Sequence, residues 1–265
     1  MRIQLIKNCR NRTRLKRNSF FGVSILTLTA CFSVDSNGIS SSEMDVRISV
    51  DAENNTTEIT ATIETVGAKF DTNFIRLTAG DRLSASMDGE TTYLQSDGAI
   101  LHLSPENNSF EGRLNNTRGG SEVIVALDRV EGEDAQAWVT LPAPLNITAP
   151  AFAETFSSDE SISIAWTPGD PEESAQIIFR TECPTANDSG ITSFRSSIHT
   201  PDTGATTVPV SDIAIDSRHS RFSLPTGVTC NTEISAVRSN RGSHNFGFGS
   251  ITASQRSRVV VNLMP

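Results

Sequence analysis

The four histidines are the first side chains to examine for chemistry, because imidazole serves both as a metal ligand and as a general base. They are His102, His199, His219 and His244. None stands at the spacing of a zinc motif such as His-Glu-x-x-His, and the chain contains no Gly-x-Ser-x-Gly elbow, phosphate loop or dinucleotide fingerprint. Local motifs therefore predict no catalytic residue, no metal site and no cofactor.

Two aspartate triplets come closest to a catalytic pattern. Asp202-Thr203-Gly204 reproduces the Asp-Thr-Gly core of aspartic proteases, and Asp188-Ser189-Gly190 is a near copy. Two such carboxylates sharing one proton would form a general acid–base dyad. In that family an apolar strand precedes the triplet, whereas here Ser-Ile-His-Thr-Pro does. The copies are also too close in sequence for two lobes, so we interpret them as turns, where Asp and Gly are common.

The N-terminal segment has the pattern of an export signal. Seven Lys and Arg residues and no acid lie within 1–18, and an uncharged, largely apolar run follows at 19–30. That run is too short to cross a bilayer, which takes roughly 20 residues. Leu28-Thr29-Ala30-Cys31 then resembles the lipobox of bacterial lipoproteins.

The lipobox resemblance implies a membrane anchor. It implies lipid on the thiol of Cys31 and cleavage between Ala30 and Cys31, which removes the signal peptide 1–30. The residue after the cysteine is Phe32 rather than aspartate, which in that family favours the outer membrane if the source is Gram-negative. Residues 31–43, rich in Ser, Asp, Asn and Gly, are expected to form a flexible tether.

The charge balance excludes some partners. The chain has 22 basic and 31 acidic residues, and removal of the seven basic residues of the signal leaves 15 against 31, or −16. Because nucleic acid demands a basic footprint, we expect no nucleic-acid partner. Cys183 and Cys230 are the cysteines that remain beside Cys31, and an even count in an exported protein favours a disulfide over a zinc or redox pair.

Period-two alternation dominates the body of the chain and predicts an all-β fold. In the first half, strands are expected at 46–51, 58–64, 73–78, 91–95, 99–103, 122–127 and 135–141, separated by turns such as Asn54-Asn55 and Asp88-Gly89. Seven short strands in about 100 residues is the count of an immunoglobulin-like sandwich. We therefore expect a β-sandwich at 44–142, followed by a proline-rich linker at 143–150.

The second half, 151–265, is expected to form a second sandwich. The segment 161–168 (SISIAWTP) places Ile162, Ile164 and Trp166 on one face and resembles the second strand of fibronectin type III domains. Further strands are expected at 175–183, 229–237, 251–253 and 259–263. The fold class predicted for the whole chain is two tandem immunoglobulin-like or fibronectin type III-like β-sandwiches.

The resemblance to fibronectin type III domains also indicates two loops as a candidate binding site. In such a sandwich the loop after the second strand and the loop before the last strand lie at the same end. One is 168–174 and the other is 240–249. Aromatics and Arg on a mobile loop are typical contact anchors, although local packing of the phenylalanines would explain the same pattern. The candidate binding residues are Asp170, Glu172, Glu173, Arg241, His244, Phe246 and Phe248.

These observations favour a non-enzymatic, lipid-anchored binding or structural module of the cell envelope, with a protein or glycan partner. The alternative is an envelope enzyme or enzyme accessory, directed at glycans, whose site is assembled from scattered Asp and Glu side chains. Two carboxylates roughly 5–10 Å apart in a shared cleft would favour the enzyme. Calcium binding by the acidic loops lacks any ordered Asp-x-Asp-x-Asp-Gly run.

Overall fold

The computed structural model describes residues 34–65, 74–78, 80–96, 109–184, 190–214 and 228–264. These residues form strands with only three short helices, η1 (Ser36–Gly38), η2 (Ser41–Glu43) and α1 (Val210–Ala214), so the all-β prediction is confirmed. Buried side chains fall into two apolar clusters, one drawn from residues 44–141 together with 246–253 and the other from residues 145–263. No helix in the described ranges is long and apolar enough to span a membrane.

The first cluster lies between two sheets, as expected for a sandwich. One layer belongs to a nine-stranded sheet and the other is the five-stranded sheet β18-β10-β9-β5-β6. The positive φ angles at Asn54, Asn55, Asp88 and Gly89 confirm the two expected hairpin turns. The strands are β2 (Met44–Glu53), β3 (Thr56–Thr65), β5 (Arg82–Met87), β6 (Glu90–Tyr93), β7 (Gln95–Ser96), β8 (Ser109–Leu114), β9 (Glu122–Asp128), β10 (Ala135–Thr140), β18 (Ser243–His244) and β19 (Phe248–Met264).

The second cluster lies between the other end of the nine-stranded sheet and the three-stranded sheet β11-β13-β16. Ile162, Ile164 and Trp166 are all buried in it, which confirms the face predicted for that strand. The strands are β11 (Ile147–Ala149), β12 (Thr155–Ser157), β13 (Ser161–Trp166), β14 (Ser174–Pro184), β15 (Ile191–Pro201), β16 (Ala205–Pro209) and β17 (Cys230–Arg241), again with β19.

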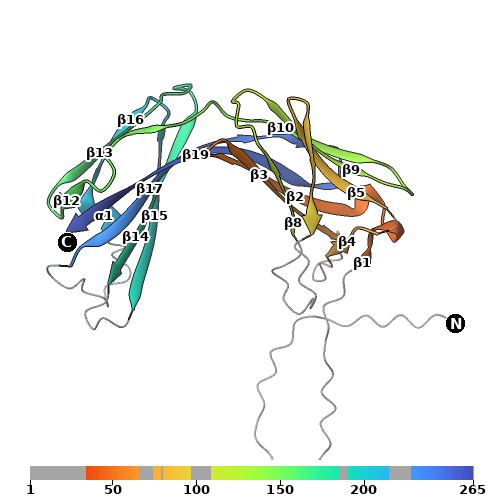
Figure 1. Ribbon diagram of the computed structural model, residues 1–265, viewed down its shortest axis with the longest axis horizontal. Coiled ribbons are helices and arrows are strands. Elements are labelled where there is room, and N and C mark those ends of the chain that lie inside the picture. Colours follow the sequence, from red (N-terminus) through yellow and green to blue (C-terminus); the bar gives the residue numbers. More distant parts are fainter. Residues whose placement is uncertain are drawn as a thin grey trace, which may run out of the picture.

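Strand β19 joins the two sandwiches. Its residues from Phe248 to Gln255 pair in parallel with β2, and those from Thr252 to Leu263 pair antiparallel with β17. The sheet order β15-β14-β17-β19-β2-β3-β8-β7 therefore runs without a break from one sandwich to the other. Figure 1 shows the result as an arch, with this sheet on its inner side and the two smaller sheets above it.

The expected assignment of 151–265 to the second sandwich alone is therefore wrong for its last part. Strand β18 pairs with β10, and Ile251 and Ala253 lie in the first core. The strands expected separately at 251–253 and 259–263 are one continuous strand. The reason is that odd-numbered residues of β19 face a core along both of its halves, as Ile251 and Val261 do.

The segment expected as a flexible tether is folded over its described part, 34–43. Strand β1 (Val34–Asp35) pairs in parallel with β4 (Ile75–Arg76). Arg129, buried after β9, donates to the backbone carbonyls of Ser36 (2.6 Å) and Ile39 (2.7 Å). Polar composition misled this prediction because the segment is held mainly by hydrogen bonds of its backbone and serine side chains, with Ile39 alone packing against the first core.

The proline-rich segment 143–150 does not act as a linker exposed between domains. Leu145 is buried in the second core, and Ile147–Ala149 is strand β11, which pairs with β13. The carbonyls of Ala143 and Pro144 accept hydrogen bonds from Arg238. The second sandwich thus begins within this segment.

Candidate functional site

The acidic loop 168–174 is exposed at one end of the second sandwich. The Asp170 carboxylate accepts from the backbone amide of Glu172 at 3.0 Å, so it shapes the turn, while Glu172 and Glu173 face solvent. Both glutamates line a hollow of about 610 Å³ together with Arg241. The structure therefore brings the acidic loop next to the start of the second predicted loop, at Asn240 and Arg241.

The rest of the second loop leads away to the first sandwich. His244 lies in β18, where its imidazole nitrogens lie 3.3 Å from the Phe246 carbonyl and 3.1 Å from the Gly249 carbonyl. Phe246 is 5% exposed and belongs to the first core, so the prediction that it is an exposed contact anchor is wrong. Phe248 is 55% exposed, at the start of β19.

The glycines of this loop serve close packing. A Cβ at Gly242 would overlap the Trp138 carbonyl oxygen, one at Gly247 would overlap the Ser42 carbonyl, and one at Gly249 would overlap the Val46 carbonyl. At all three positions the backbone of the loop packs directly against the backbone of the first sandwich. Glycine permits such an approach because it lacks a side chain, and this explains a composition that we interpreted as mobility.

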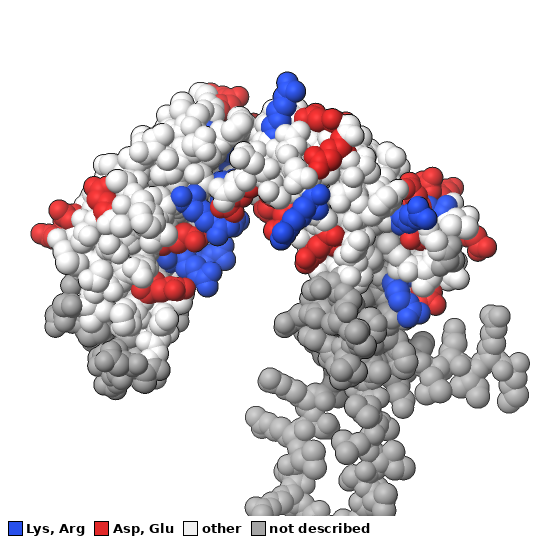
Figure 2. Space-filling model, in the orientation of Figure 1, with Lys and Arg blue, Asp and Glu red and all other residues white. Residues whose placement is uncertain are grey.

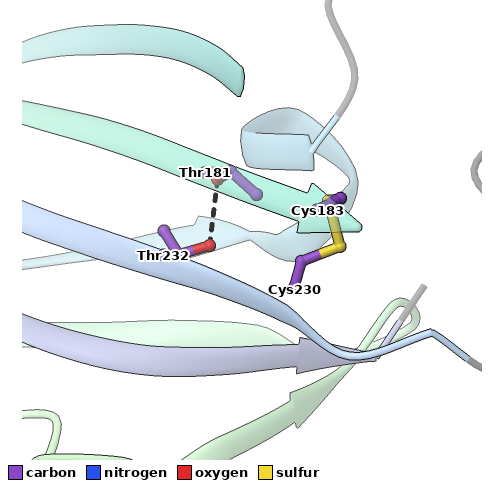
Figure 3. The surroundings of a disulfide bond; sticks show 4 residues. All are labelled: Thr181, Cys183, Cys230 and Thr232. Atoms are coloured by element: carbon purple, nitrogen blue, oxygen red, sulfur yellow. Dashed lines mark hydrogen bonds between the residues drawn. A yellow bond between two sulfur atoms is a disulfide. The ribbon is translucent and has the colours of Figure 1, made fainter. Parts of the chain in front are cut away.

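The predicted disulfide between Cys183 and Cys230 is confirmed. The two cysteines lie at the adjoining ends of β14 and β17, with Cα atoms 4.4 Å apart and both residues buried. Two residues away on each strand, the hydroxyls of Thr181 and Thr232 are 2.9 Å apart and form a hydrogen bond (Figure 3). The disulfide therefore joins the two ends of the segment that contains β15, β16 and α1.

Asp202, expected only as part of a turn, lies at the centre of a buried polar cluster. Its carboxylate is paired with the guanidinium of Arg238, and Trp166 Nε1 donates to it at 2.7 Å. Arg238 also donates to the carbonyls of Thr167 and Pro144, the latter at 2.8 Å. A Cβ at Gly169 would overlap Asp202 Oδ2, so glycine is required there. Sequence reasoning missed this cluster because its members are far apart along the chain.

The cluster holds Asp202 ionised. Burial acts most strongly and would raise the pKa of the carboxyl, but hydrogen bonds from Arg238 and Trp166, the Arg238 charge and the Gly169 amide together outweigh it. The net effect lowers the pKa of Asp202 below its usual value. The carboxylate is thus committed to a structural ion pair and is not available as a proton donor.

Four arginines gather on the exposed face of the nine-stranded sheet in the second sandwich. This face forms the inner side of the arch, and we call it the concave face. Figure 2 shows Lys and Arg side chains gathered there, on the inner side of one limb. A hollow of about 400 Å³ is lined by Arg180, Arg195, Arg256 and Arg258, together with Glu233.

These arginines differ in their partners. Arg258 is 2.7 Å from Glu53 and 3.7 Å from Glu233, and Arg180 is 3.5 Å from Glu182. Within the part of the chain that the structure describes, Arg195 and Arg256 have no ion pair, and the buried Nε of Arg256 has no hydrogen-bond partner. The concave face therefore holds cationic groups that no carboxylate of the described residues neutralises.

The carboxylates closest to a shared site line a neighbouring hollow of about 380 Å³, formed by β2, β3, β8 and β19, which Arg256 and Arg258 also line. Asp51 accepts from Ser254 and from Ser49 (2.6 Å), Glu58 pairs with Arg113 (2.9 Å) and Glu53 pairs with Arg258 (2.7 Å). Each is engaged by a donor on an open sheet face, which does not favour an acid–base pair. Among the described residues, no group of three His, Cys, Asp or Glu side chains is placed to hold a metal ion.

Several candidate residues lie outside the described residues. They are Ala30 and Cys31 of the lipobox, His102 and His219, Asp188 of the second aspartate triplet, and the strand expected at 99–103.

Comparisons with known proteins give only distant structural likenesses. No family model matches the chain, and no curated protein matches it. The FN1-FN3 domains of chicken CNTN1 are similar over 88% of this chain and 68% of theirs, at 11% identity and a TM-score of 0.31. The fibronectin(III)-like modules of Clostridium thermocellum CbhA are similar over 83% of this chain and 93% of theirs, at 14% identity and a TM-score of 0.20. Our assignment of two β-sandwiches rests on the strands and the two cores described above.

Proposed function

We propose that the chain is a lipid-anchored, non-enzymatic binding module of the bacterial cell envelope, which presents the concave face of its arch to a partner. The observation that carries the binding role is the group of arginines on that face, two of which lack an ion pair among the described residues. A group of cations left without counter-charges in an acidic chain is typical of a contact surface rather than of a stabilising network.

The anchor is supported by the lipobox at Leu28–Cys31 and the basic and apolar segments before it. More than one acyl chain on a single cysteine would make the attachment lasting, because each buried CH₂ contributes about 0.8 kcal/mol. Residues 34–43 pack against the first sandwich. We infer that the folded body stands close to the lipid rather than at the end of a long tether.

Membrane fractionation of wild-type protein and a Cys31→Ala variant tests the anchor. We expect wild type in the membrane fraction and the variant in the soluble fraction. Identical fractionation of the two would overturn the proposal. Protease treatment of intact cells then places the partner, since digestion indicates an external partner and protection until the outer membrane is opened indicates a periplasmic one.

A further inference from the structure

We propose that the concave face binds an anionic polysaccharide through Arg180, Arg195, Arg256 and Arg258. This inference deepens the proposed binding function and rests on it. The four arginines come from three strands, β14, β15 and β19, so they become neighbours only in the assembled sheet.

The register of the sheet places like charges side by side. Arg180 on β14 lies directly opposite Arg195 on β15. Like charges at directly opposite positions destabilise a sheet, and a bound anion would remove that repulsion. On its other side, Arg180 lies opposite Glu233 of β17 in the sheet register. The Glu233 carboxylate forms its ion pair with Arg258, at 3.7 Å.

Arg256 supplies a second, independent observation. Its Nε is buried and has no hydrogen-bond partner among the described residues, while its side chain lines the hollow with Arg258, two residues further along the same face. An unpaired buried donor costs free energy unless a ligand or water completes it. Guanidinium groups suit carboxylate, sulfate and phosphate oxygens because their N–H groups form two parallel hydrogen bonds.

The spread of the arginines indicates a polymer rather than a small ion. Strands β15 and β19 are separated by β14 and β17, which is about 14 Å across the sheet, and the register sets Arg195 four residues, or about 13 Å, along the strands from the row of Arg256. One small anion cannot contact both, whereas a chain with repeated charges can. Because the face is concave, a linear polymer can enter it while a flat lipid surface cannot (Figure 2).

The other lining residues favour a glycan among the polyanions. Isolated serines and the partly buried Ile178 and Phe194 complete the hollow, so it offers no exposed aromatic anchor of the kind that dominates protein interfaces. Of the two serines, Ser235 is buried and donates to Glu233, whereas the exposed Ser193 places a hydroxyl beside the cations, which suits the hydroxyls and charges of an acidic polysaccharide.

The test measures binding of the full-length protein, purified in a neutral detergent, to polygalacturonate and dextran sulfate, with uncharged dextran as the blank. We expect at least one anionic polymer to bind, with an affinity that falls as salt rises from about 50 to 300 mM. Arg195→Gln combined with Arg256→Gln should weaken binding at least about tenfold, since each loses a charge-assisted hydrogen bond.

The matched control is Arg47→Gln combined with Arg113→Gln. It removes the same charge from the same sheet face, but these arginines are already paired, with Asp45 and Glu58. We expect at most about a twofold change. Equal losses in the two double variants, or no binding of any anionic polymer, would overturn the proposal.

Two further outcomes are distinguishable. If the Arg256 substitution prevents folding, the exposed Arg195→Gln alone must weaken binding about threefold, and an unchanged affinity counts against the site. If polyglutamate binds as tightly as the polysaccharides and with the same dependence on the arginines, the occupant is an acidic polypeptide and the glycan assignment fails. A soluble wild type that binds polysaccharide would refute the lipid anchor and leave this site standing.

Discussion

At the scale of single residues, two buried arginines fix the polypeptide that enters each sandwich. Arg129 is paired with Asp81 and donates to the carbonyls of Ser36 and Ile39. Arg238 is paired with Asp202 and donates to the carbonyls of Ala143 and Pro144. In both cases an aspartate neutralises the guanidinium, and the remaining N–H groups of the arginine donate to carbonyl groups of an irregular segment. Those carbonyl groups would otherwise have no hydrogen-bond partner.

Replacing Asp202 with asparagine should destabilise the protein strongly. Asparagine keeps the shape and an acceptor for Trp166, but it leaves the Arg238 charge buried without a counter-charge. Breaking a buried pair from one side costs about 3–5 kcal/mol. Urea unfolding at pH 7 measures it. Glu58→Gln is the control, since it breaks an exposed pair with Arg113 and should cost less than about 1 kcal/mol. Equal costs would contradict this account of the cluster.

The same pair predicts a pH dependence. The pKa of Asp202 is lower in the folded protein than the ordinary value of 3.8, so the unfolded chain binds its proton first as the pH falls. Its contribution is therefore complete above about pH 4–5 and is lost as the pH falls through the folded pKa. The difference in unfolding free energy between wild type and Asp202→Asn should shrink between pH 6 and pH 2.5. A difference that stays constant with pH would contradict the ionised state of Asp202.

At the scale of elements, β19 and the loop before it hold the two sandwiches together. Gly247→Ala should cost roughly 1–3 kcal/mol, because its Cβ would overlap the Ser42 carbonyl and force the loop off the first sandwich. Gly38→Ala is the control, since no atom of the described residues lies within 4 Å of a Cβ added there. Thermal unfolding of both variants measures the difference, and equal midpoints would show that the loop does not pack closely.

The disulfide between Cys183 and Cys230 should stabilise the second sandwich. Removing both cysteines by alanine substitution is expected to cost about 2–4 kcal/mol, because the bridge restricts the unfolded chain across a separation of 47 residues. Denaturant unfolding measures this cost. Thiol labelling of the denatured protein should find neither cysteine reactive before reduction and both reactive after it. Labelling of both without reduction would contradict the bridge.

Alternating patterns in the sequence identified most of the core strands but not their partners. Strands β5 and β8 were missed, although Leu83, Ala85 and Met87 of β5 alternate with polar residues. The core faces of β2, β3, β9, β10, β13 and β14 could be predicted because every second residue is apolar. Strand β15 was missed because, at the edge of the sheet, none of its side chains is fully buried. The shared role of β19 could not be predicted either, since parallel pairing with β2 joins residues about 200 positions apart and leaves no local signal.

The candidate site shows the same limit. The concave arginines are ordinary polar positions in each strand, and only the sheet register brings Arg180 beside Arg195. Asp202 looks like a turn residue because its partners, Trp166 and Arg238, are each 36 positions away. The disulfide could be predicted because the signal pattern predicts export, and an even cysteine count in an exported protein favours a bridge without any geometry.

At the scale of the whole molecule, the continuous sheet makes the arch one cooperative body rather than two domains on a linker. A strand that contributes to both cores, as β19 does through Ile251 and Val261, cannot leave one sandwich without disturbing the other. The concave face also depends on this continuity, since Arg256 and Arg258 lie next to the crossing point. We therefore expect the two sandwiches to unfold together.

The two tryptophans allow this coupling to be measured, because Trp138 lies in β10 of the first sandwich and Trp166 in β13 of the second. In a Trp138→Phe background, fluorescence reports only on the second sandwich. Leu83→Ala then creates a cavity in the first core and should cost about 2–5 kcal/mol. If the arch is one body, the Trp166 fluorescence midpoint falls together with the midpoint from circular dichroism. An unchanged Trp166 midpoint would mean that β19 is a hinge between independent sandwiches, and the concave face would then not have a fixed shape.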